Sequence, residues 1–549
     1  MFGSITYPRQ WTLLILHLAI PSALFRFLAS LFPKSEKSPI AAPGAVPIFG
    51  HLDALIFSPT KLASIFAASP KHGNVLRLKL PFTELWIVNQ ASQILPTLST
   101  PKIYDFEPMK SMALRNIVGL SGAALTAIDE DNSGVSTKPL PDSNIHPDNR
   151  FNYLERKMTQ DFTRPSSHAA LVQKFSQNLH QWVEECNIGE EWVTPPDLHI
   201  FVRDILFKAT TDAFFGPHLL RLSPDLVEDI WKFDQDVPFL AKGLPAFLKP
   251  KAYRARARCI EAFRKWRSFA LKNGPQSDTL PEWNDIFGLK CMKLRNELFE
   301  KTRGWKYDEG ACAASDLAVL FGLTSNAIRA SFWFLLETLQ SNELFDDASK
   351  EVTSVATSSG SSLHIDERNL LRLPLLQSIY AETLRKYVSV MMVRKTRQAS
   401  RLGGYTVPIG KKVVICNYSE HMNEALWQPE TGNDLHPVGQ FWGRRFLSYS
   451  KDAPNTPTFA TENLGRKWMP FGVGERMCPG RHFTKHQMLL TFALLSSNFD
   501  IELTVSTGNK AEPDMTHFGY GTMGPDRPMP FRIRRKFARQ THKDSAAWL

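Results

Sequence analysis

The sequence predicts an α+β fold that is mainly helical with small β-sheets. Hydrophobic residues make up 43% of the 549 residues, enough for a large buried core, and this composition excludes a disordered, collagen-like or coiled-coil chain. Residues 151–348 mostly follow an amphipathic helical pattern, whereas short strands and loops dominate after residue 400. No clear linker interrupts residues 51–549, so we expect one large domain there, although the length alone allows three or four.

Before this body, residues 11–32 form an apolar stretch interrupted by Pro21 and Arg26. About 20 apolar residues span a membrane, so we expect residues 1–38 to be a membrane anchor. A cleaved signal peptide is disfavoured, because a basic leader and a small-residue cleavage site are missing. A helix packed on the body is the other alternative. The Pro-rich segment 39–50 that follows predicts a stiff hinge.

Further along the chain, residues 75–88 have strand character that is broken by a turn near residues 81–83. Residues 129–150 are polar and rich in turn-forming residues, which predicts a loop. The last strong helical pattern runs from about residue 481 to residue 497.

Charge and cysteine content narrow the class of function. The net charge of +11 is modest for this length, and it suits a membrane surface or an acidic protein partner better than nucleic acid. Six cysteines without a C-x-x-C pair argue against a disulfide scaffold and a structural zinc site. Five of them are expected to be ordinary buried thiols: Cys186, Cys259, Cys291, Cys312 and Cys416.

The sixth cysteine lies in the segment WMPFGVGERMCPGRHF, residues 468–483, with the pattern F-x-x-G-x-R-x-C-x-G. Cys478 stands just before a helix start, where backbone N–H groups stabilise a thiolate. Gly480 permits close approach of the backbone to a flat cofactor. Phe471 is placed to shield the sulfur from water, and Arg476 to pair with an anionic substituent of the cofactor. The pattern therefore predicts a metal-bound thiolate.

This loop resembles the haem-binding loop of the cytochrome P-450 superfamily of haem-thiolate monooxygenases, in its membrane-anchored eukaryotic, fungal type. The resemblance implies haem b with Cys478 as the axial iron ligand and Arg476 as a haem-propionate contact. It also places Phe471 and Gly480 at the cofactor.

Other segments resemble the same family. Glu382 and Arg385 form an E-x-x-R motif, three residues apart on one helix face. The segment FWGRRF resembles the P-E-R-F motif, although Gly443 and Arg444 replace its Pro and Glu. The resemblance implies a structural triad of Glu382, Arg385 and Arg445.

Two further propionate contacts are implied by the resemblance. Arg394 stands where the family often has a second basic residue for the haem. In the early helix the candidate is Arg156 or Lys157, and a solvated helix face is an equally good interpretation of both.

Residues 316–336, DLAVLFGLTSNAIRASFWFLL, look like the central helix on the distal side of the haem, where typical members carry an acid–Thr pair. One register places Thr324 and Ser325 at these two positions. The other places Asn326 and Ala327 there, and its pattern N-A-x-x-A-x-F-W is similar to the sterol 7α-hydroxylase and prostacyclin synthase group. We favour the second register and take Asn326, Ser325 and Thr324 as catalytic candidates.

An amide and a methyl group cannot donate protons as an acid and a hydroxyl do. Monooxygenation then needs ordered water, Thr324, Ser325 or a substrate hydroxyl as proton source. The first alternative is an oxygen-independent isomerase or dehydratase acting on a peroxide, and the second is a non-catalytic haem-binding protein. Asn326 also has a purely structural interpretation, as a residue that bonds a backbone carbonyl.

Residues 237–248 are apolar and precede a basic run, which predicts either a loop that enters a membrane surface or one that packs in the core. Together with residues 388–392 and 520–523, inferred to line the distal side, this suggests a hydrophobic substrate such as a sterol, terpenoid or other secondary metabolite. Nothing in the chain resembles a flavin or NADPH domain, so the resemblance implies a separate NADPH–cytochrome P-450 reductase, with Lys467 and Arg481 as contact candidates. The expected location is the endoplasmic reticulum membrane, with the catalytic domain in the cytosol and without nucleic acid as partner.

Overall fold

The structure is a computed structural model with two compact units, which are described separately: residues 1–106 with 392–420, and residues 107–391 with 421–549. The predicted anchor lies outside the described residues except for Ser38. The structure describes residues 38–47, 49–81, 83–89, 94, 97, 99–100, 102–120, 122–275, 280–301, 308–359, 362–427, 436–450, 453–460, 467–505 and 509–536.

The first unit is built on a β-sheet. Its strands follow the order β1-β2-β3-β12-β9, and β4 pairs with β9. The predicted break near residues 81–83 is confirmed, because β2 and β3 form an antiparallel hairpin around it. The elements are β1 (Ile40–Ala41), α2 (Leu52–Ile56), α3 (Pro59–Ala68), β2 (Val75–Lys79), β3 (Glu84–Val88), β4 (Tyr104–Asp105), β9 (Val388–Thr396), β10 (Ser400–Leu402), β11 (Tyr405–Val407), β12 (Lys412–Cys416) and α19 (Asn417–His421).

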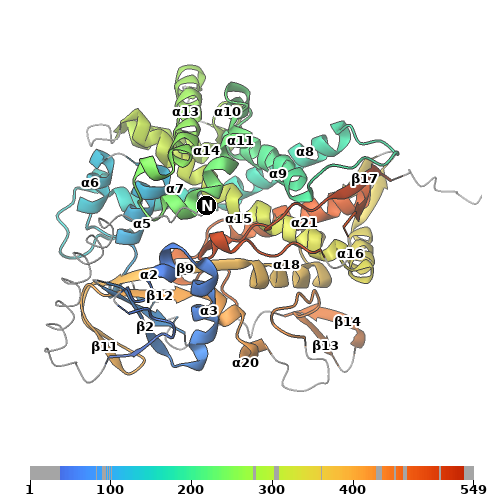
Figure 1. Cartoon of the computed structure of the whole chain (residues 1–549). Coiled ribbons are helices and arrows are strands. Elements are labelled where there is room, and N and C mark those ends of the chain that lie inside the picture. Colours follow the sequence, from blue (N-terminus) through green and yellow to red (C-terminus); the bar gives the residue numbers. More distant parts are fainter. Residues whose placement is uncertain are drawn as a thin grey trace, which may run out of the picture. The chain divides into compact units, whose positions relative to one another are not determined.

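Helices dominate the second unit (Figure 1). They are α5 (Glu107–Ala113), α6 (Gly122–Glu130), α7 (Phe151–Asp161), α8 (Pro165–Glu185), α9 (Leu198–Phe215), α10 (His218–Leu222), α11 (Leu226–Gln235), α12 (Val237–Leu240), α13 (Pro250–Asn273), α14 (Lys290–Lys301), α15 (Glu309–Leu339), α16 (Asn342–Ser354), α17 (Glu367–Leu370), α18 (Pro374–Tyr387), α20 (Glu424–Trp427) and α21 (Arg481–Asn498).

Short strand pairs complete the second unit. The first residues of β9, Val388 to Val390, pair antiparallel with β16 (Tyr520–Thr522). The other described strands of this unit form separate two-stranded sheets: β5 (Trp283–Asn284) with β6 (Gly288–Leu289), β7 (Ala356–Ser359) with β8 (Ser362–Ile365), β13 (Leu447–Ser450) with β14 (Ala453–Phe459), and β15 (Phe499–Leu503) with β17 (Phe531–Arg535). The predicted fold class, mainly helical with small sheets, is confirmed.

Helix α15 is the centre of this unit and packs against α9, α13, α18 and α21 (Figure 1). It begins where the Asp308 side chain accepts a hydrogen bond from the backbone N–H of Ala311, a typical N-cap. Its apolar residues include Phe332 and Trp333, which are fully buried. Within the described part of the chain it is also the one helix long and apolar enough to cross a membrane, and 67% of its most apolar window is buried. Such burial is typical of a core helix.

Candidate active site

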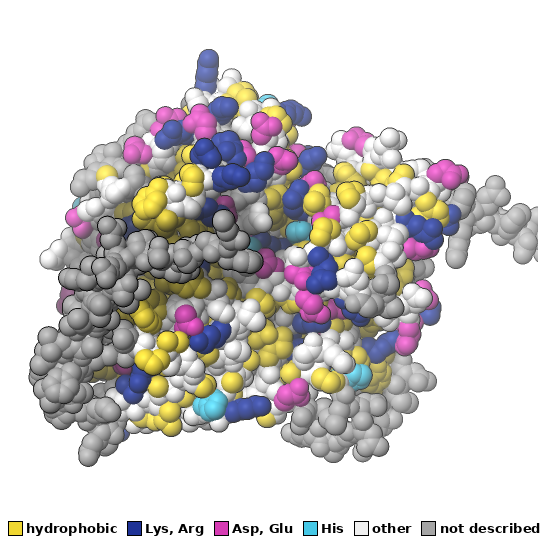
Figure 2. Space-filling model, viewed as in Figure 1, with side chains coloured by type: hydrophobic (Ala, Val, Ile, Leu, Met, Phe, Trp, Pro, Cys, Tyr) yellow, Lys and Arg dark blue, Asp and Glu magenta, His cyan; other side chains and the backbone are white. Residues whose placement is uncertain are grey.

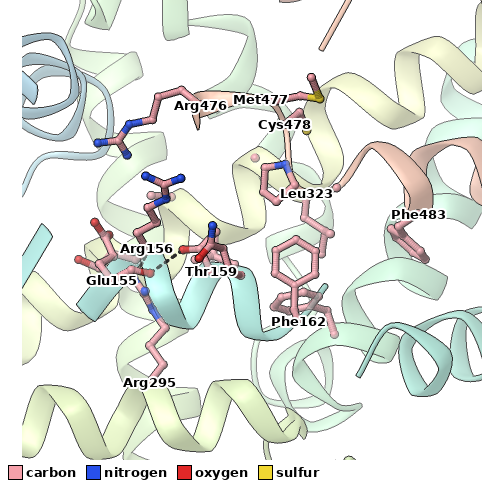
Figure 3. Close-up of a pocket in the computed structure, with 18 of the residues that line it drawn as sticks. Glu155, Arg156, Thr159, Phe162, Arg295, Leu323, Arg476, Met477, Cys478 and Phe483 are labelled. Carbon is pink, nitrogen blue, oxygen red and sulfur yellow. Dashed lines mark hydrogen bonds between the residues drawn. The ribbon is translucent and has the colours of Figure 1, made fainter. Parts of the chain in front are cut away.

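A cavity of about 460 Å³ lies beside Cys478 in the second unit (Figure 3), within the size range of small-molecule and cofactor sites. Its walls come from α5, α7, α9, α14, α15, the start of α21 and the loop before it. The cavity is therefore built from chain segments more than 300 residues apart. Its lining consists of Lys110, Glu155, Arg156, Thr159, Gln160, Phe162, Phe214, Arg295, Ser315, Ala318, Val319, Gly322, Leu323, Arg476, Met477, Cys478, Pro479, Gly480, Phe483 and Thr484.

The loop around Cys478 is folded by its own backbone. The N–H of Cys478 donates to the carbonyl of Phe471 at 3.0 Å, which closes the loop, and α21 begins three residues later at Arg481. Burial raises the pKa of the Cys478 thiol, while hydrogen bonds from the backbone N–H groups of Gly480 and Arg481 act in the opposite direction. Because burial outweighs these donors, a thiolate at this position fits best with the positive charge of a metal ion beside it.

One end of the cavity is basic. Arg156 and Arg476 line it, and Figure 3 shows their guanidinium groups on the same side of the cavity. Lys110 and Arg295 lie there too, but Lys110 pairs with Glu155 at 2.5 Å and Arg295 donates to Asp316 at 2.9 Å. Burial opposes ionisation of Glu155, yet Lys110 and Arg295 hold its pKa below the usual value. Positive charge thus exceeds negative charge at this end, as anionic substituents of a cofactor require.

The opposite part of the cavity is apolar. The central helix α15 contributes Ala318, Val319 and Leu323, and Figure 3 shows Leu323 and Phe162 on the same side of Cys478. Gly322, which also lines the cavity, is exposed although it lies in the middle of a core helix. Because Gly322 has no side chain, the helix backbone itself forms the surface there. Together the basic end, the apolar wall and the cysteine fit a flat cofactor that carries a metal and acidic groups.

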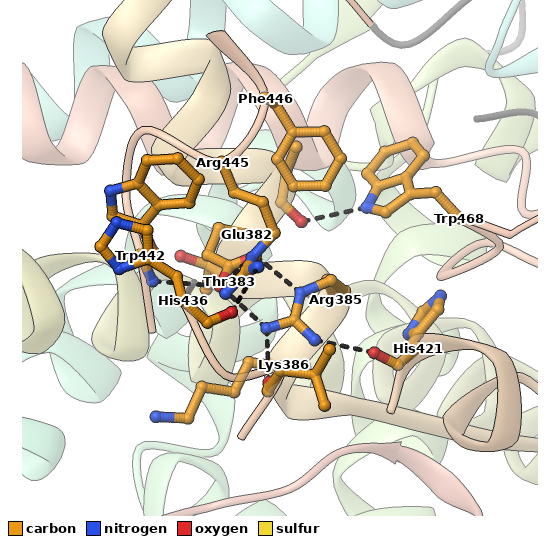
Figure 4. Close-up of polar contacts among 12 residues, drawn as sticks. Glu382, Thr383, Arg385, Lys386, His421, His436, Trp442, Arg445, Phe446 and Trp468 are labelled. Atoms are coloured by element: carbon orange, nitrogen blue, oxygen red, sulfur yellow. Dashed lines mark hydrogen bonds and ion pairs between the residues drawn. The ribbon is translucent and has the colours of Figure 1, made fainter. Parts of the chain in front are cut away.

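The structure brings the three residues of the predicted triad together (Figure 4). Arg385 donates to both carboxylate oxygens of Glu382, at 2.7 and 2.8 Å, and Arg445 Nε donates to the same oxygens at 3.1 Å. Glu382 and Arg385 are fully buried. Arg385 also donates to the carbonyl of His421 at 2.7 Å, and the His421 ring accepts from the N–H of Met469 at 3.0 Å. Through His421 the triad is tied to the start of the cysteine loop.

Not every cofactor-binding prediction falls on the cavity. Arg156 lines it, whereas the alternative, Lys157, is exposed and is absent from the lining. Phe471 packs edge-on against Trp468, with ring centroids 6.3 Å apart, and is not part of the lining either. Arg394 belongs to the first unit, where its guanidinium lies 4.9 Å above the Phe106 ring and burial lowers its pKa to about 10. Its role at a haem stays a prediction.

The three catalytic candidates on α15 have different surroundings. The Thr324 hydroxyl donates to the carbonyl of Leu320 at 2.8 Å, and the Ser325 hydroxyl donates to Asp234 at 2.5 Å. Both residues are buried. Asn326 is exposed, and its Oδ1 accepts a hydrogen bond from the backbone N–H of Thr522 at 2.7 Å. None of the three lines the cavity around Cys478.

Sequence reasoning did not identify Lys110 and Arg295 at the basic end of the cavity. Lys110 belongs to the short helix α5 and Arg295 to the amphipathic helix α14, and neither lies in a recognisable motif. It also missed the ion pair of Arg329 with Asp234. The signal for that pair was present, because Arg329 is the single charged residue in the stretch 317–336 of α15.

Comparisons with known proteins agree with this geometry. Residues 149–524 match the family model described as Cytochrome P-450. The monooxygenase efuG of Hormonema carpetanum is 33% identical over 67% of this chain and 69% of its own length. The monooxygenase calL of Penicillium decumbens is 28% identical over 85% of this chain and 88% of its own. The cholesterol 7-alpha-monooxygenase of Cricetulus griseus is 25% identical over 90% and 92%.

The triad generates a stability prediction. Replacing Glu382 by Gln leaves two buried guanidinium groups without a counter-charge, and removing one partner of a buried ion pair costs about 3–5 kcal/mol. We expect Glu382→Gln to lower the free energy of unfolding by that amount in urea titrations followed by circular dichroism. Arg444→Ala is the matched control, because Arg444 pairs with the partly exposed Asp347 and such pairs contribute about 0–1 kcal/mol. Equal losses in both variants would contradict a special role of the triad.

Proposed function

This chain belongs to the cytochrome P-450 family and is a haem-thiolate monooxygenase, and from that premise we propose that it hydroxylates a hydrophobic substrate such as a sterol, terpenoid or other secondary metabolite. We propose that it uses dioxygen and electrons from a separate NADPH–cytochrome P-450 reductase. The observation that carries the proposal is the cavity that joins Cys478 to a basic end and an apolar wall.

The residues around this cavity fit haem b. Cys478 would hold the iron, and Arg156 and Arg476 would hold the propionates. When bound, the haem supplies the activation of dioxygen, which a thiolate ligand favours through electron donation. The protein keeps Cys478 on a closed loop and directs the N–H groups of Gly480 and Arg481 at its sulfur.

Proton supply is the second task of the protein. The hydroxyl hydrogens of Thr324 and Ser325 are committed to Leu320 and Asp234, so neither is directed at the cavity. Asn326 faces open space on the same helix, and its amide can orient a water molecule or a substrate hydroxyl without giving up a proton itself. We propose that ordered water or the substrate delivers the proton, with Asn326 as the orienting group.

Asn326 and Ala327 stand where typical family members carry the acid–Thr pair, and they suggested an alternative function, an oxygen-independent isomerase that acts on a peroxide. Three relatives that match 67%, 85% and 90% of this chain are named monooxygenases, and one of them is named for cholesterol 7-alpha-monooxygenation. These names support an oxygen-dependent reaction and a bulky apolar substrate. A non-catalytic haem-binding protein has no comparable support.

Exposed apolar side chains support attachment to a membrane. Of the apolar segment 237–248, the first half packs in the core, with Val237 and Leu240 buried, whereas Phe247 is 79% exposed. The first half of the segment therefore fits the predicted core loop, and the second half fits the predicted membrane loop. The basic helix α13 begins directly after this segment, and Figure 2 shows Lys and Arg side chains where Figure 1 places α13. We propose contact of Ala246–Leu248 with an anionic bilayer.

We further propose an anchor at residues 1–38, a hinge at 39–50 and a single catalytic domain at 51–549, held at the endoplasmic reticulum on its cytosolic side. The family match supports one domain, since it runs through residues 392–420 as well as their flanks. For the reductase, Lys467 and Arg481 stay our contact candidates. Both are partly exposed near the cysteine loop, where Arg481 donates to the carbonyl of Cys478 at 3.2 Å.

The ligand assignment predicts a spectrum. Cys478→Ala removes the sulfur, so the reduced, CO-treated protein is expected to lose the Soret band at the position typical of thiolate ligation. Cys186→Ala is the control, because Cys186 donates to the carbonyl of Val183 on α8, away from the cavity. A thiolate-type band that persists in Cys478→Ala would refute the ligand assignment.

The basic end of the cavity predicts a difference between two neighbouring residues. Arg156→Ala should release haem to an excess of apomyoglobin roughly ten to a hundred times faster, because a hydrogen bond to a charged group contributes about 1.5–3 kcal/mol. Lys157→Ala removes an exposed charge of the same sign and should leave the rate unchanged. Equal rates in the two variants would remove Arg156 from the propionate contacts.

Labelled dioxygen tests the reaction itself. The full chain in reductase-containing microsomes is incubated with NADPH, ¹⁸O₂ and a panel of sterols and terpenoids, and products are analysed by mass spectrometry. We expect a product that gains one ¹⁸O atom and depends on NADPH. A product that forms from a peroxide substrate without NADPH and without label would favour the isomerase instead.

A further inference from the structure

A buried polar cluster joins α11 to the central helix α15. Asp234 on α11 accepts from the Ser325 hydroxyl at 2.5 Å and forms an ion pair with Arg329, one helical turn after Ser325. His517 lies within 3.3 Å of the Arg329 guanidinium and 3.2 Å of the Asp234 carbonyl oxygen. All four side chains are buried, and Asp234 is only 2% exposed. A carboxylate and a guanidinium are costly to bury, so each depends on the other.

The same arginine reaches the backbone of β16. Arg329 donates to the carbonyl of Thr522 at 3.3 Å, while the N–H of Thr522 donates to Asn326 Oδ1 at 2.7 Å. Two side chains of α15 therefore hold one residue of β16 through both of its backbone polar groups. Trp333, one turn further along α15, donates to the carbonyl of Met523 at 2.7 Å. These contacts fix β16 along the central helix.

This arrangement also fixes the Asn326 carboxamide. Its oxygen is occupied by Thr522, so its NH₂ group is left as the free end, and no hydrogen-bond partner for that group occurs in the described part of the chain. Asn326 is exposed, between the buried Ser325 and Ala327, and lies one turn after Gly322, which lines the cavity. Asn326 thus lies on the side of α15 that borders the cavity, although it is not part of the cavity lining.

Gly521 leaves the space that Asn326 fills. A Cβ atom at Gly521 would lie 1.9 Å from Asn326 Oδ1, far inside any van der Waals contact, and the φ angle of +142° is one that other residues rarely adopt. The glycine and the ion pair are thus independent devices that hold the same carboxamide. Gly521 leaves room for the carboxamide of Asn326, and the ion pair holds the Thr522 peptide that bonds this carboxamide.

We propose that Asp234 and Arg329 are positioning residues: their ion pair holds Thr522, and Thr522 holds Asn326 with its NH₂ group directed to the distal side of the cavity as a hydrogen-bond donor. Arg329 suits this task because its planar fork serves the carboxylate and the backbone carbonyl at once. The inference rests on haem binding at Cys478 and is independent of the substrate class.

The test uses carbon monoxide on the reduced full-length protein as the probe, because the infrared C–O stretching frequency responds to the polar groups near the ligand. Asn326→Leu removes the donor and sets the reference shift. Arg329→Met, Asp234→Asn and Gly521→Ala leave Asn326 in the sequence but release or displace its side chain. Glu228→Gln is the control, since Glu228 is an exposed carboxylate of α11 that pairs only with Lys232 at 2.6 Å.

We expect the three positioning variants to shift the band in the same direction as Asn326→Leu, and Glu228→Gln to leave it unchanged. An unshifted band in Asn326→Leu would overturn the inference, because the donor would not face the cavity. So would a shift in Asn326→Leu that none of the three positioning variants reproduces. If Arg329→Met and Asp234→Asn fail to fold, Arg329→Lys takes their place, because it keeps a positive charge beside Asp234 but lacks the planar fork that also reaches the Thr522 carbonyl. An unshifted band in Arg329→Lys would then overturn the role of Arg329. A thiolate-type CO band in each variant shows that haem binding itself is intact.

Discussion

The neutralisation of the buried carboxylate of Glu382 organises the part of the molecule around Cys478. The carboxylate has no access to water, so its charge must be met inside the protein, and Arg385 and Arg445 meet it from α18 and from the loop after His436. Arg385 then reaches the carbonyl of His421, and the ring of His421 holds Met469, where the cysteine loop begins. The place of the sulfur thus depends on an ion pair that lies outside the lining of the cavity.

Local spacing made part of this site predictable. Cys478, Arg476 and Gly480 lie in one short segment, and Glu382 and Arg385 share a helix face, so the sequence alone indicates their proximity. Arg445 was found through its motif even though two neighbouring motif residues are replaced. The helical class, the hairpin of β2 and β3 and the last helix were predictable for the same reason, because hydrophobic periodicity reports local structure.

Long-range geometry was not predictable in this way. Lys110 and Arg295 reach the basic end of the cavity from segments without a motif, and the orientation of Asn326 is set by Thr522, 196 residues later. Periodicity identified residues 237–248 as apolar but could not divide them into a core half and an exposed half, since large apolar side chains occur in both. Such distinctions depend on which surfaces the tertiary fold covers.

The Asn326 carboxamide has one consequence for how the enzyme responds to its medium. A carboxylic acid at the distal side loses its proton as the pH rises, and its ability to donate a hydrogen bond is lost with it. An amide has no such ionisation in the range where proteins stay folded, so its NH₂ hydrogens are present in acid and in alkali alike. With its oxygen held by Thr522, the side chain offers a constant polarity to whatever occupies the cavity, and any pH dependence of turnover must then originate elsewhere.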